Sequence, residues 1–182
     1  LAVHTVHNWR NAPGVRAITA ALSDGAIGPV RRIEWATLRT RPAVTVTTNG
    51  AANWRTNPAI AGGGILVDHG WHALYLLLAL VRARPQRIGA TLERRRYTTA
   101  DVEDTAACYI EFPSAQAEIH LTWAGTERRT RWQLDGTDGT LSSFAAFFFE
   151  PCPPPAASAG NVATPMASIA ATSDQCVRRK AA

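Results

Sequence analysis

The chain has 182 residues, of which 46% are hydrophobic and 18% are charged, so it contains enough apolar material for the core of one domain. Its formal net charge is +5, yet the 19 basic residues include a single lysine, Lys180, which excludes Schiff-base or P-loop chemistry by a core lysine of this chain. Three cysteines without paired spacing argue against a disulfide framework and favour a reducing cytoplasm.

Membrane insertion and secretion are not expected from the sequence. The longest apolar stretch, residues 73–81, is far shorter than the roughly 20 residues that a membrane-spanning helix needs. Residues 1–10 are polar and do not have the pattern of a signal peptide. We therefore expect a cytoplasmic protein with no membrane partner.

The first part of the chain predicts a strand, a helix, a second strand and a loop. Residues 1–8 alternate imperfectly and predict the end of a strand. Asn11 and Pro13 predict the start of a helix that ends at Gly25. Residues 30–40 alternate in period two and predict a strand, and residues 41–58 predict a long loop of the kind that often carries function.

The second part predicts one buried helix and then consecutive strands. Apolar residues are too numerous in residues 59–81 for a single narrow stripe, which predicts a helix buried on much of its circumference. The periodicity that follows predicts four short strands, the middle two forming an antiparallel hairpin, at residues 87–97, 104–112, 116–124 and 130–135. We expect Trp35, Trp123 and Trp132 to be core or interface anchors and Cys108 to be buried.

This order of elements predicts an α+β fold with an open, mostly antiparallel β-sheet and helices packed on one face. We place this domain at residues 1–144. Residues 151–182 are rich in proline and alanine and contain no aromatic residue, so they cannot bury enough apolar area to offset the entropy of ordering. We therefore predict a disordered C-terminal tail at residues 145–182.

The residues most suggestive of chemistry lie at the start of the buried helix. Gly62, Gly63 and Gly64 would expose backbone N–H groups and allow another molecule to approach closely. Asp68 and His72 are four residues apart, so on an α-helix their side chains share a face and can meet. A carboxylate beside an imidazole would orient the ring and raise its basicity, although a purely structural pair fits the spacing equally well.

The run from Gly62 to His72 resembles the GGGxxxDxGxH signature of the second domain of the glucose–fructose oxidoreductase/inositol dehydrogenase/MocA-like family. The order of surrounding motifs is also similar, over about residues 1–141. It comprises Asn8-x-Arg10 with Pro13, the turn from Gly25 to Gly28, Asn53-Trp54-Arg55 before the glycines, and the run from Gly136 to Leu141. We take the three letters shared by residues 8–10 and 53–55 as coincidence.

The resemblance implies an oxidoreductase that moves hydride between NAD or NADP and a hydroxyl carbon of a sugar, polyol or related compound. By that resemblance, His72 would be the general base and Asp68 would orient it, and the domain would form homo-oligomers through the sheet. A substrate pocket would be lined by Asn8, Arg10, Trp54, Arg55, Trp71 and Tyr75, with Gly62, Gly63 and Gly64 in close approach to the cofactor.

The sequence also departs from the family pattern. It contains no strand–GxGxxG–helix unit, so we expect this chain to bind no dinucleotide tightly and to be inactive alone. The lysine of the family's Glu-Lys-Pro motif is missing with that unit, and Tyr75 stands where many members have aspartate. Met166 is the single methionine, so we expect the chain to begin inside a longer gene product or after processing.

Alternatives remain open at this point. The domain could be a non-catalytic ligand-binding or dimerisation scaffold. A metal-dependent hydrolase using Asp68, His69 and His72 is a third reading, but we expect no metal, because His69 would point away from the face of Asp68. The arginine-rich runs at residues 94–96 and 128–131 lie on predicted strands without stacking aromatic motifs, so we expect no nucleic-acid partner.

Overall fold

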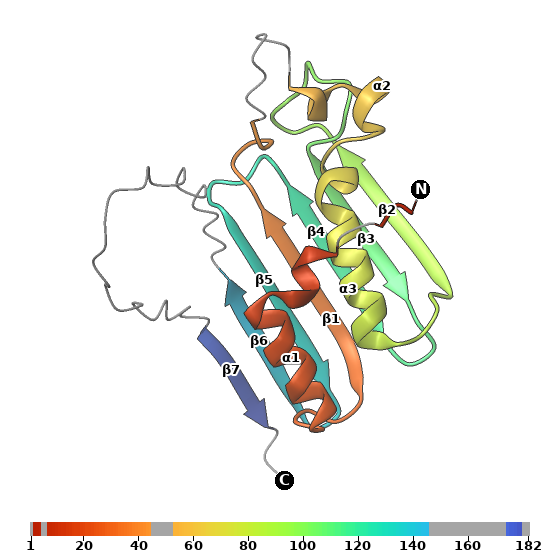
Figure 1. The fold of residues 1–182 in the computed structure, drawn as a ribbon, viewed down its shortest axis with the longest axis vertical. Coiled ribbons are helices and arrows are strands. Elements are labelled where there is room, and N and C mark those ends of the chain that lie inside the picture. The colour runs from red at the N-terminus through yellow and green to blue at the C-terminus, as the bar shows by residue number, and fades with distance from the viewer. Residues whose placement is uncertain (1, 5–6, 45–52, 146–173, 180–182) are drawn as a thin grey trace, which may run out of the picture.

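The structure is a computed structural model that describes residues 2–4, 7–44, 53–145 and 174–179. Its centre is a seven-stranded sheet with the strand order β2-β3-β4-β1-β5-β6-β7 (Figure 1). The strands, in chain order, are β1 Val30–Leu38, β2 Arg87–Glu93, β3 Thr105–Glu111, β4 Gln116–Thr122, β5 Arg129–Gly136, β6 Gly139–Ala145 and β7 Asp174–Arg179. The β1–β4 pair is parallel and every other neighbouring pair is antiparallel. The α+β fold with a mostly antiparallel sheet is therefore confirmed.

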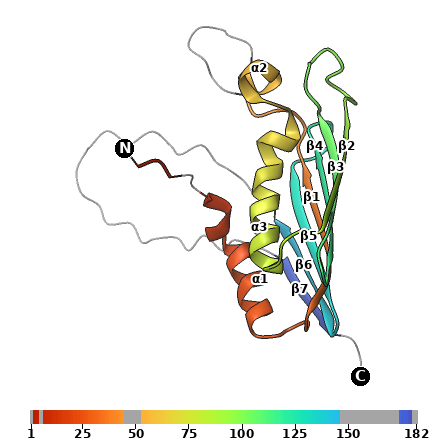
Figure 2. The same cartoon turned by 90° about the vertical axis from the view of Figure 1, so that its right-hand side faces the viewer.

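Helices cover only one face of the sheet, as Figure 2 shows. On β4 and β5, alternate side chains are buried under this layer, and the side chains on the opposite face are mostly polar. Trp35 and Trp132 are directly paired across β1 and β5, with their rings stacked at 4.7 Å between centroids. Both are buried, as are Trp123 and Cys108, which confirms their predicted place in the core.

Two helices supply the apolar side of the helical layer. Helix α1 (Pro13–Ser23) buries Val15 and Ile18, which are three residues apart and so share one stripe. Helix α3 (Trp71–Val81) buries Ala73, Leu76 and Leu77. Burial of a large aliphatic side chain is worth about 1.5–3 kcal/mol, so these contacts hold both helices on the sheet.

The predicted helix at residues 59–81 is interrupted. A short helix, α2 (Pro58–Ala61), ends at Gly62, which adopts the left-handed conformation with a φ of 77°. The chain re-enters the helix through a π-helical turn, Leu66–Gly70, which continues directly into α3. Three successive glycines permit this break, which apolar periodicity alone does not reveal.

The stretch Pro58–Val81 is long and apolar enough to cross a membrane by length and composition alone, with a mean hydropathy of 1.5. Core helices of soluble proteins pass the same test. Here α3 lies over the sheet (Figure 2), and its apolar side chains complete the core.

Three further elements of the structure were not predicted from the sequence. The described part of residues 1–8 contains no strand, and a 3₁₀-helix, Asn8–Asn11, precedes α1. Strand β6 was not predicted as an element of its own. Strand β7, Asp174–Arg179, lies within the segment predicted as a disordered tail and pairs with β6. The other tail residues, 146–173 and 180–182, and residues 45–52 of the predicted loop lie outside the described residues.

Candidate functional site

A cavity of about 460 Å³ lies where β1 ends and the π-helical turn begins. It is open to solvent and lies within the usual volume range of small-molecule sites. Five segments contribute side chains to it. They are the 3₁₀-helix before α1, the end of β1, the 3₁₀-helix Trp54–Thr56, the π-helical turn and the first turn of α3. The polar and aromatic lining residues are Asn8, Trp9, Arg39, Arg55, Asp68, His69, His72 and Arg128.

Asp68 is bound to two cationic or polar partners rather than to His72. Its Oδ1 lies 3.1 Å from Nε of Arg55, and its Oδ2 lies 3.0 Å from Nδ1 of His69. A π-helical turn contains more residues than an α-turn, so side chains four apart are no longer stacked above one another. The predicted contact between Asp68 and His72 is therefore replaced by contacts with Arg55 and the neighbouring His69. This is a correction to the expectation from α-helical spacing.

The environment of Asp68 keeps its carboxylate ionised. Burial opposes ionisation, but the adjacent His69 and the hydrogen bond and charge of Arg55 hold the pKa of Asp68 below its ordinary value. The carboxylate is thus a fixed negative charge in the wall of the cavity.

His72 lies between two indole rings. Its imidazole stacks on Trp9 with 4.3 Å between ring centroids and 7° between planes, and Trp71 lies 4.0 Å away on a tilted plane. Burial, with the nearby His69, lowers the pKa of His72 to about 4, although the charge of Asp68 acts in the opposite direction. The ring is consequently neutral near pH 7 and has one nitrogen free of a proton.

Tyr75 holds the orientation of His72. The Tyr75 hydroxyl lies 3.3 Å from Nδ1 of His72 and accepts a hydrogen bond of 3.1 Å from the backbone N–H of Trp9. Its ring also stacks on His7 at 4.4 Å between centroids. The residue predicted to contact substrate therefore contacts the imidazole, one turn further along α3.

The three glycines have structural roles that the sequence did not reveal. The backbone N–H groups of Gly64 and Leu66 donate to the Glu103 carboxylate at 2.9 and 3.0 Å, and that of Ile65 donates to the Glu103 carbonyl at 3.1 Å. A side chain at Gly64 would collide with the backbone of Glu103. The amides expected to face a cofactor at Gly64 are therefore occupied by Glu103.

The remaining predicted residues divide between two hollows. Asn8 and Arg55 line the main cavity. Trp54 and Trp71 line a smaller neighbouring hollow of about 130 Å³, which Arg55 and Asp68 share. The guanidinium of Arg55 lies over the Trp54 ring at 4.4 Å. Arg10 is exposed and is not among the lining residues of either hollow.

Sequence reasoning missed Trp9, Arg39 and Arg128. Arg39 continues the inward-facing series Ile33, Trp35 and Thr37, and an arginine at such a position is an available signal for a buried charge. The similar triplets at residues 8–10 and 53–55, taken as coincidence, both contribute to the site through Asn8, Trp9 and Arg55. Nothing in the local sequence indicates that Arg128 reaches the same cavity.

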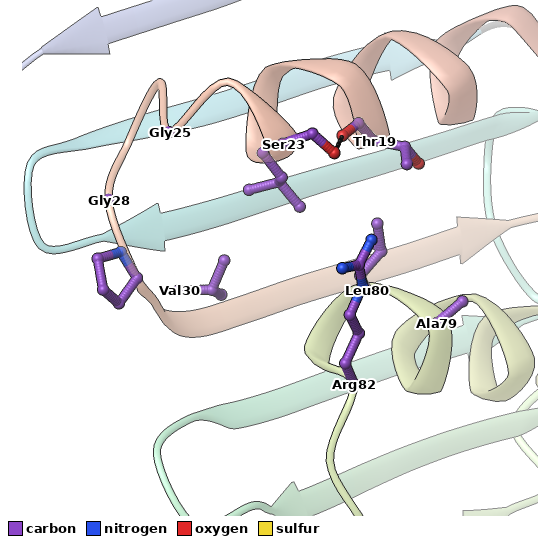
Figure 3. Close-up of a pocket in the computed structure, with 10 residues that line it drawn as sticks. Thr19, Ser23, Gly25, Gly28, Val30, Ala79, Leu80 and Arg82 are labelled. Carbon is purple, nitrogen blue, oxygen red and sulfur yellow. Dashed lines mark hydrogen bonds between the residues drawn. The ribbon is translucent and has the colours of Figure 1, made fainter.

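A further hollow of about 350 Å³ lies at the C-terminal ends of α1 and α3 (Figure 3). The hydroxyl groups of Thr19 and Ser23 already donate to the carbonyls of Val15 and Thr19. Arg82 is the one charged residue that lines this hollow, and no carboxylate or imidazole is among the lining residues. This hollow therefore lacks the groups for acid–base chemistry.

Among the described residues, no group of three or more His, Cys, Asp or Glu side chains could hold a metal ion.

Comparison with known protein families gives a match to one family over most of the chain. The sequence profile of the GFO/IDH/MocA C-terminal domain matches residues 15–142, which is more than half of the chain. The chain belongs to the GFO/IDH/MocA C-terminal domain family. The family resemblance inferred from the residues is thereby confirmed. A comparison with proteins of curated function gives no match.

Solved structures with a similar fold include proteins described as an oxidoreductase and as a dehydrogenase homologue. GenD2 from gentamicin A biosynthesis, in complex with NAD, is 28% identical with a TM-score of 0.65 over 76% of this chain and 38% of its own. An aldose–aldose oxidoreductase from Caulobacter crescentus, complexed with glycerol, is 25% identical with a TM-score of 0.62 over 76% and 39%. An inositol dehydrogenase homologue from Azotobacter vinelandii, complexed with NAD⁺, shares the fold at 21% identity with a TM-score of 0.65 over 76% and 37%. The GFO/IDH/MocA C-terminal domain described here spans about two fifths of the length of these chains.

Proposed function

We propose that this chain is the substrate-binding domain of an NAD(P)-dependent oxidoreductase that acts on a hydroxyl group of a sugar, a polyol or a related compound. The observation that carries the proposal is a neutral imidazole, His72, in the wall of an open cavity. The names of GenD2, complexed with NAD, and of the aldose–aldose oxidoreductase support the reaction class and the substrate class.

We infer that the dinucleotide is held mainly by parts of the enzyme other than the residues described here. The backbone amides of Gly64, Ile65 and Leu66 are bonded to Glu103, so they do not form a cradle for phosphate groups. In the complete enzyme, the nicotinamide cofactor would accept the hydride that leaves the substrate carbon. The steps below concern only the residues of this chain.

His72 accepts the proton of the substrate hydroxyl in this proposal. The Tyr75 oxygen already receives a hydrogen bond from Trp9, and it lies beside Nδ1 of His72. If Nδ1 carries the hydrogen and donates it to Tyr75, Nε2 keeps its lone pair and can take a proton from the hydroxyl. The ionised Asp68 then stabilises the imidazolium through its charge, which favours the protonated form of His72.

Kinetics in the full-length protein test the role of His72. His72→Ala should lower kcat/KM for hydroxyl oxidation by the 10²- to 10⁴-fold that is typical of a general base. Tyr75→Phe should cause a smaller loss, about tenfold, because only the preference for one tautomer is removed. His120→Ala, on the uncovered face of the sheet, is the matched control and should leave the rate unchanged. Full turnover by His72→Ala would contradict the proposal.

We also propose that the uncovered face of the sheet is a contact between copies of this chain. The face carries polar side chains together with Tyr109, which is 37% exposed. A hollow of about 280 Å³ lies at its centre, lined by residues of β1, β4, β5 and β6 such as Glu34, His120 and Arg131. A large uncovered sheet face with a central hollow is a suitable shape for a self-complementary contact.

A further inference from the structure

The cavity beside His72 is rich in guanidinium groups. Arg39, Arg55 and Arg128 all line it, and Asp68 is the one carboxylate among its lining residues. Asp68 is already paired with Arg55. Three positive charges against one negative charge leave the walls with two positive charges in excess, since His72 is neutral near pH 7.

Arg39 is a buried cation without an ion-pair partner in the described part of the chain. The residue is 6% exposed. Nη1 donates to the carbonyls of Leu38 and Arg129 at 2.7 and 3.1 Å, and Nη2 donates to the Thr130 hydroxyl at 3.2 Å. Nε is also buried and has no hydrogen-bond partner among the described residues. Burying a charge is costly unless it is neutralised, so this arrangement favours an anion beside Arg39.

Arg128 adds a second cation at the rim. It is exposed, and no described carboxylate lies within ion-pair distance of it, whereas the adjacent Arg129 pairs with Glu127 at 2.9 Å. Burial lowers the pKa of Arg39 to about 10, and the charge of Arg128 acts in the same direction, while the charge of Asp68 opposes both. Arg39 nevertheless remains charged near pH 7. An anion between the two guanidinium groups would relieve the repulsion between them.

We propose that the cavity binds a hydroxy acid of the sugar-acid class, with the carboxylate held by Arg39 and Arg128 and a hydroxyl group presented to His72. This inference rests on the proposed function and names the substrate class for the same site. Different elements supply the groups for carboxylate binding and for proton transfer. The guanidinium groups come from the end of β1 and the residue before β5, and the imidazole comes from the first turn of α3. A carboxylate is the substrate group that two guanidinium groups recognise best by charge and geometry.

Calorimetric titration of the chain with matched sugars tests the proposal. Galacturonate and galactose differ at one carbon, which is a carboxylate in the first and a hydroxymethyl group in the second. We expect galacturonate to bind about tenfold more tightly at low ionic strength, and the difference to shrink as salt is added. Glucuronate with glucose forms a second pair with the same expectation.

Charge reversal at the rim provides the matched variants. Arg128→Glu should weaken galacturonate binding by about tenfold and change galactose binding less than twofold. Arg84→Glu makes the same change of charge between α3 and β2, away from the cavity and from the uncovered face, and it should alter neither affinity. Both positions are exposed, so both variants should fold, which circular dichroism would verify.

The outcomes separate this inference from the proposed function. Equal affinity for galacturonate and galactose would overturn the sugar-acid assignment and leave the role of His72 intact. Absence of binding by every sugar would overturn both. If inorganic phosphate and NADP, but no sugar acid, bound with an affinity that depends on Arg128, the anion would belong to the cofactor, and the substrate assignment would be wrong.

Discussion

His72 owes its neutral state to its neighbours. The indole of Trp9 stacks on one side of the imidazole and Trp71 lies close to it, so both remove water from the ring. Tyr75 bridges the ring to the backbone of the 3₁₀-helix that precedes α1. A base that acts on a hydroxyl must be unprotonated before it acts, and this packing supplies that state at neutral pH.

The pKa of His72 predicts a pH dependence of stability. The folded value of about 4 lies below the ordinary 6.5, so the unfolded chain binds more protons between these two pH values. The free energy of unfolding should therefore fall as the pH falls from 6.5 to 4. Urea titrations across this range should show a shallower decline for His72→Gln than for the unaltered chain. Identical slopes would show that His72 is not held neutral by folding.

For individual residues, the sequence predicted which side chains share the cavity better than it predicted the contacts between them. Asp68, His72, Arg55 and Asn8 were expected at one site, and the structure brings them to one cavity. The partner of Asp68 was wrong because a π-helical turn changes the offset between side chains, and apolar spacing does not distinguish it from an α-turn. Arg128 was missed because its position depends on the pairing of distant strands.

The π-helical turn depends on the loop that carries Glu103. That residue satisfies three backbone N–H groups at the start of the turn, which would otherwise lack partners. The site is therefore fixed from outside its own segment, by the loop just before β3. A break of the helix at Gly62 allows the glycines to pack directly against that loop.

Substitution at Gly64 should disrupt this junction. Gly64→Ala would force its Cβ against the Glu103 backbone, and overpacking of this kind costs about 3 kcal/mol of unfolding free energy. Gly89→Ala is the matched control, because a Cβ at that position in β2 meets no atom within 4 Å. It should change stability by less than about 0.5 kcal/mol. Equal chemical-denaturation midpoints for the two variants would contradict the proposed packing role.

The elements themselves were predicted best where periodicity was strong. Strands β1, β3, β4 and β5 and helix α1 lie close to their predicted positions, because apolar residues on one face reveal a half-buried element. The 3₁₀-helix before α1 was not predicted, since four residues are too few to show a period, and the described part of residues 1–8 does not form the predicted strand. Strand order was not predictable either: β1 lies between β4 and β5, which are far from it along the chain.

At the scale of the whole molecule, helices cover one face of the sheet and leave the other face, the bare face, uncovered. The helices lie on the covered side of the sheet (Figure 2). The cavity is lined by residues on that side, and the proposed contact between copies lies on the other face. Oligomerisation would therefore leave the substrate cavity open. This separation allows the two proposals to be tested independently.

Sedimentation velocity should detect the contact between copies. The chain is expected to sediment as a dimer at micromolar concentration, and Tyr109→Arg should shift it toward the monomer by placing a charge on the bare face. Arg16→Glu, on the exposed side of α1, should leave the dimer intact. A monomer at all concentrations for the unaltered chain would rule out this use of the face.

The most direct test of the central claim is the ring-nitrogen NMR spectrum of the histidines, recorded with and without galacturonate. The account predicts a neutral His72 at pH 7 with its hydrogen on Nδ1, and a shift of its Nε2 resonance when the sugar acid is added. His120, on the bare face of the sheet, should not respond. A protonated His72 at pH 7, or a response of His120 without one of His72, would contradict the account.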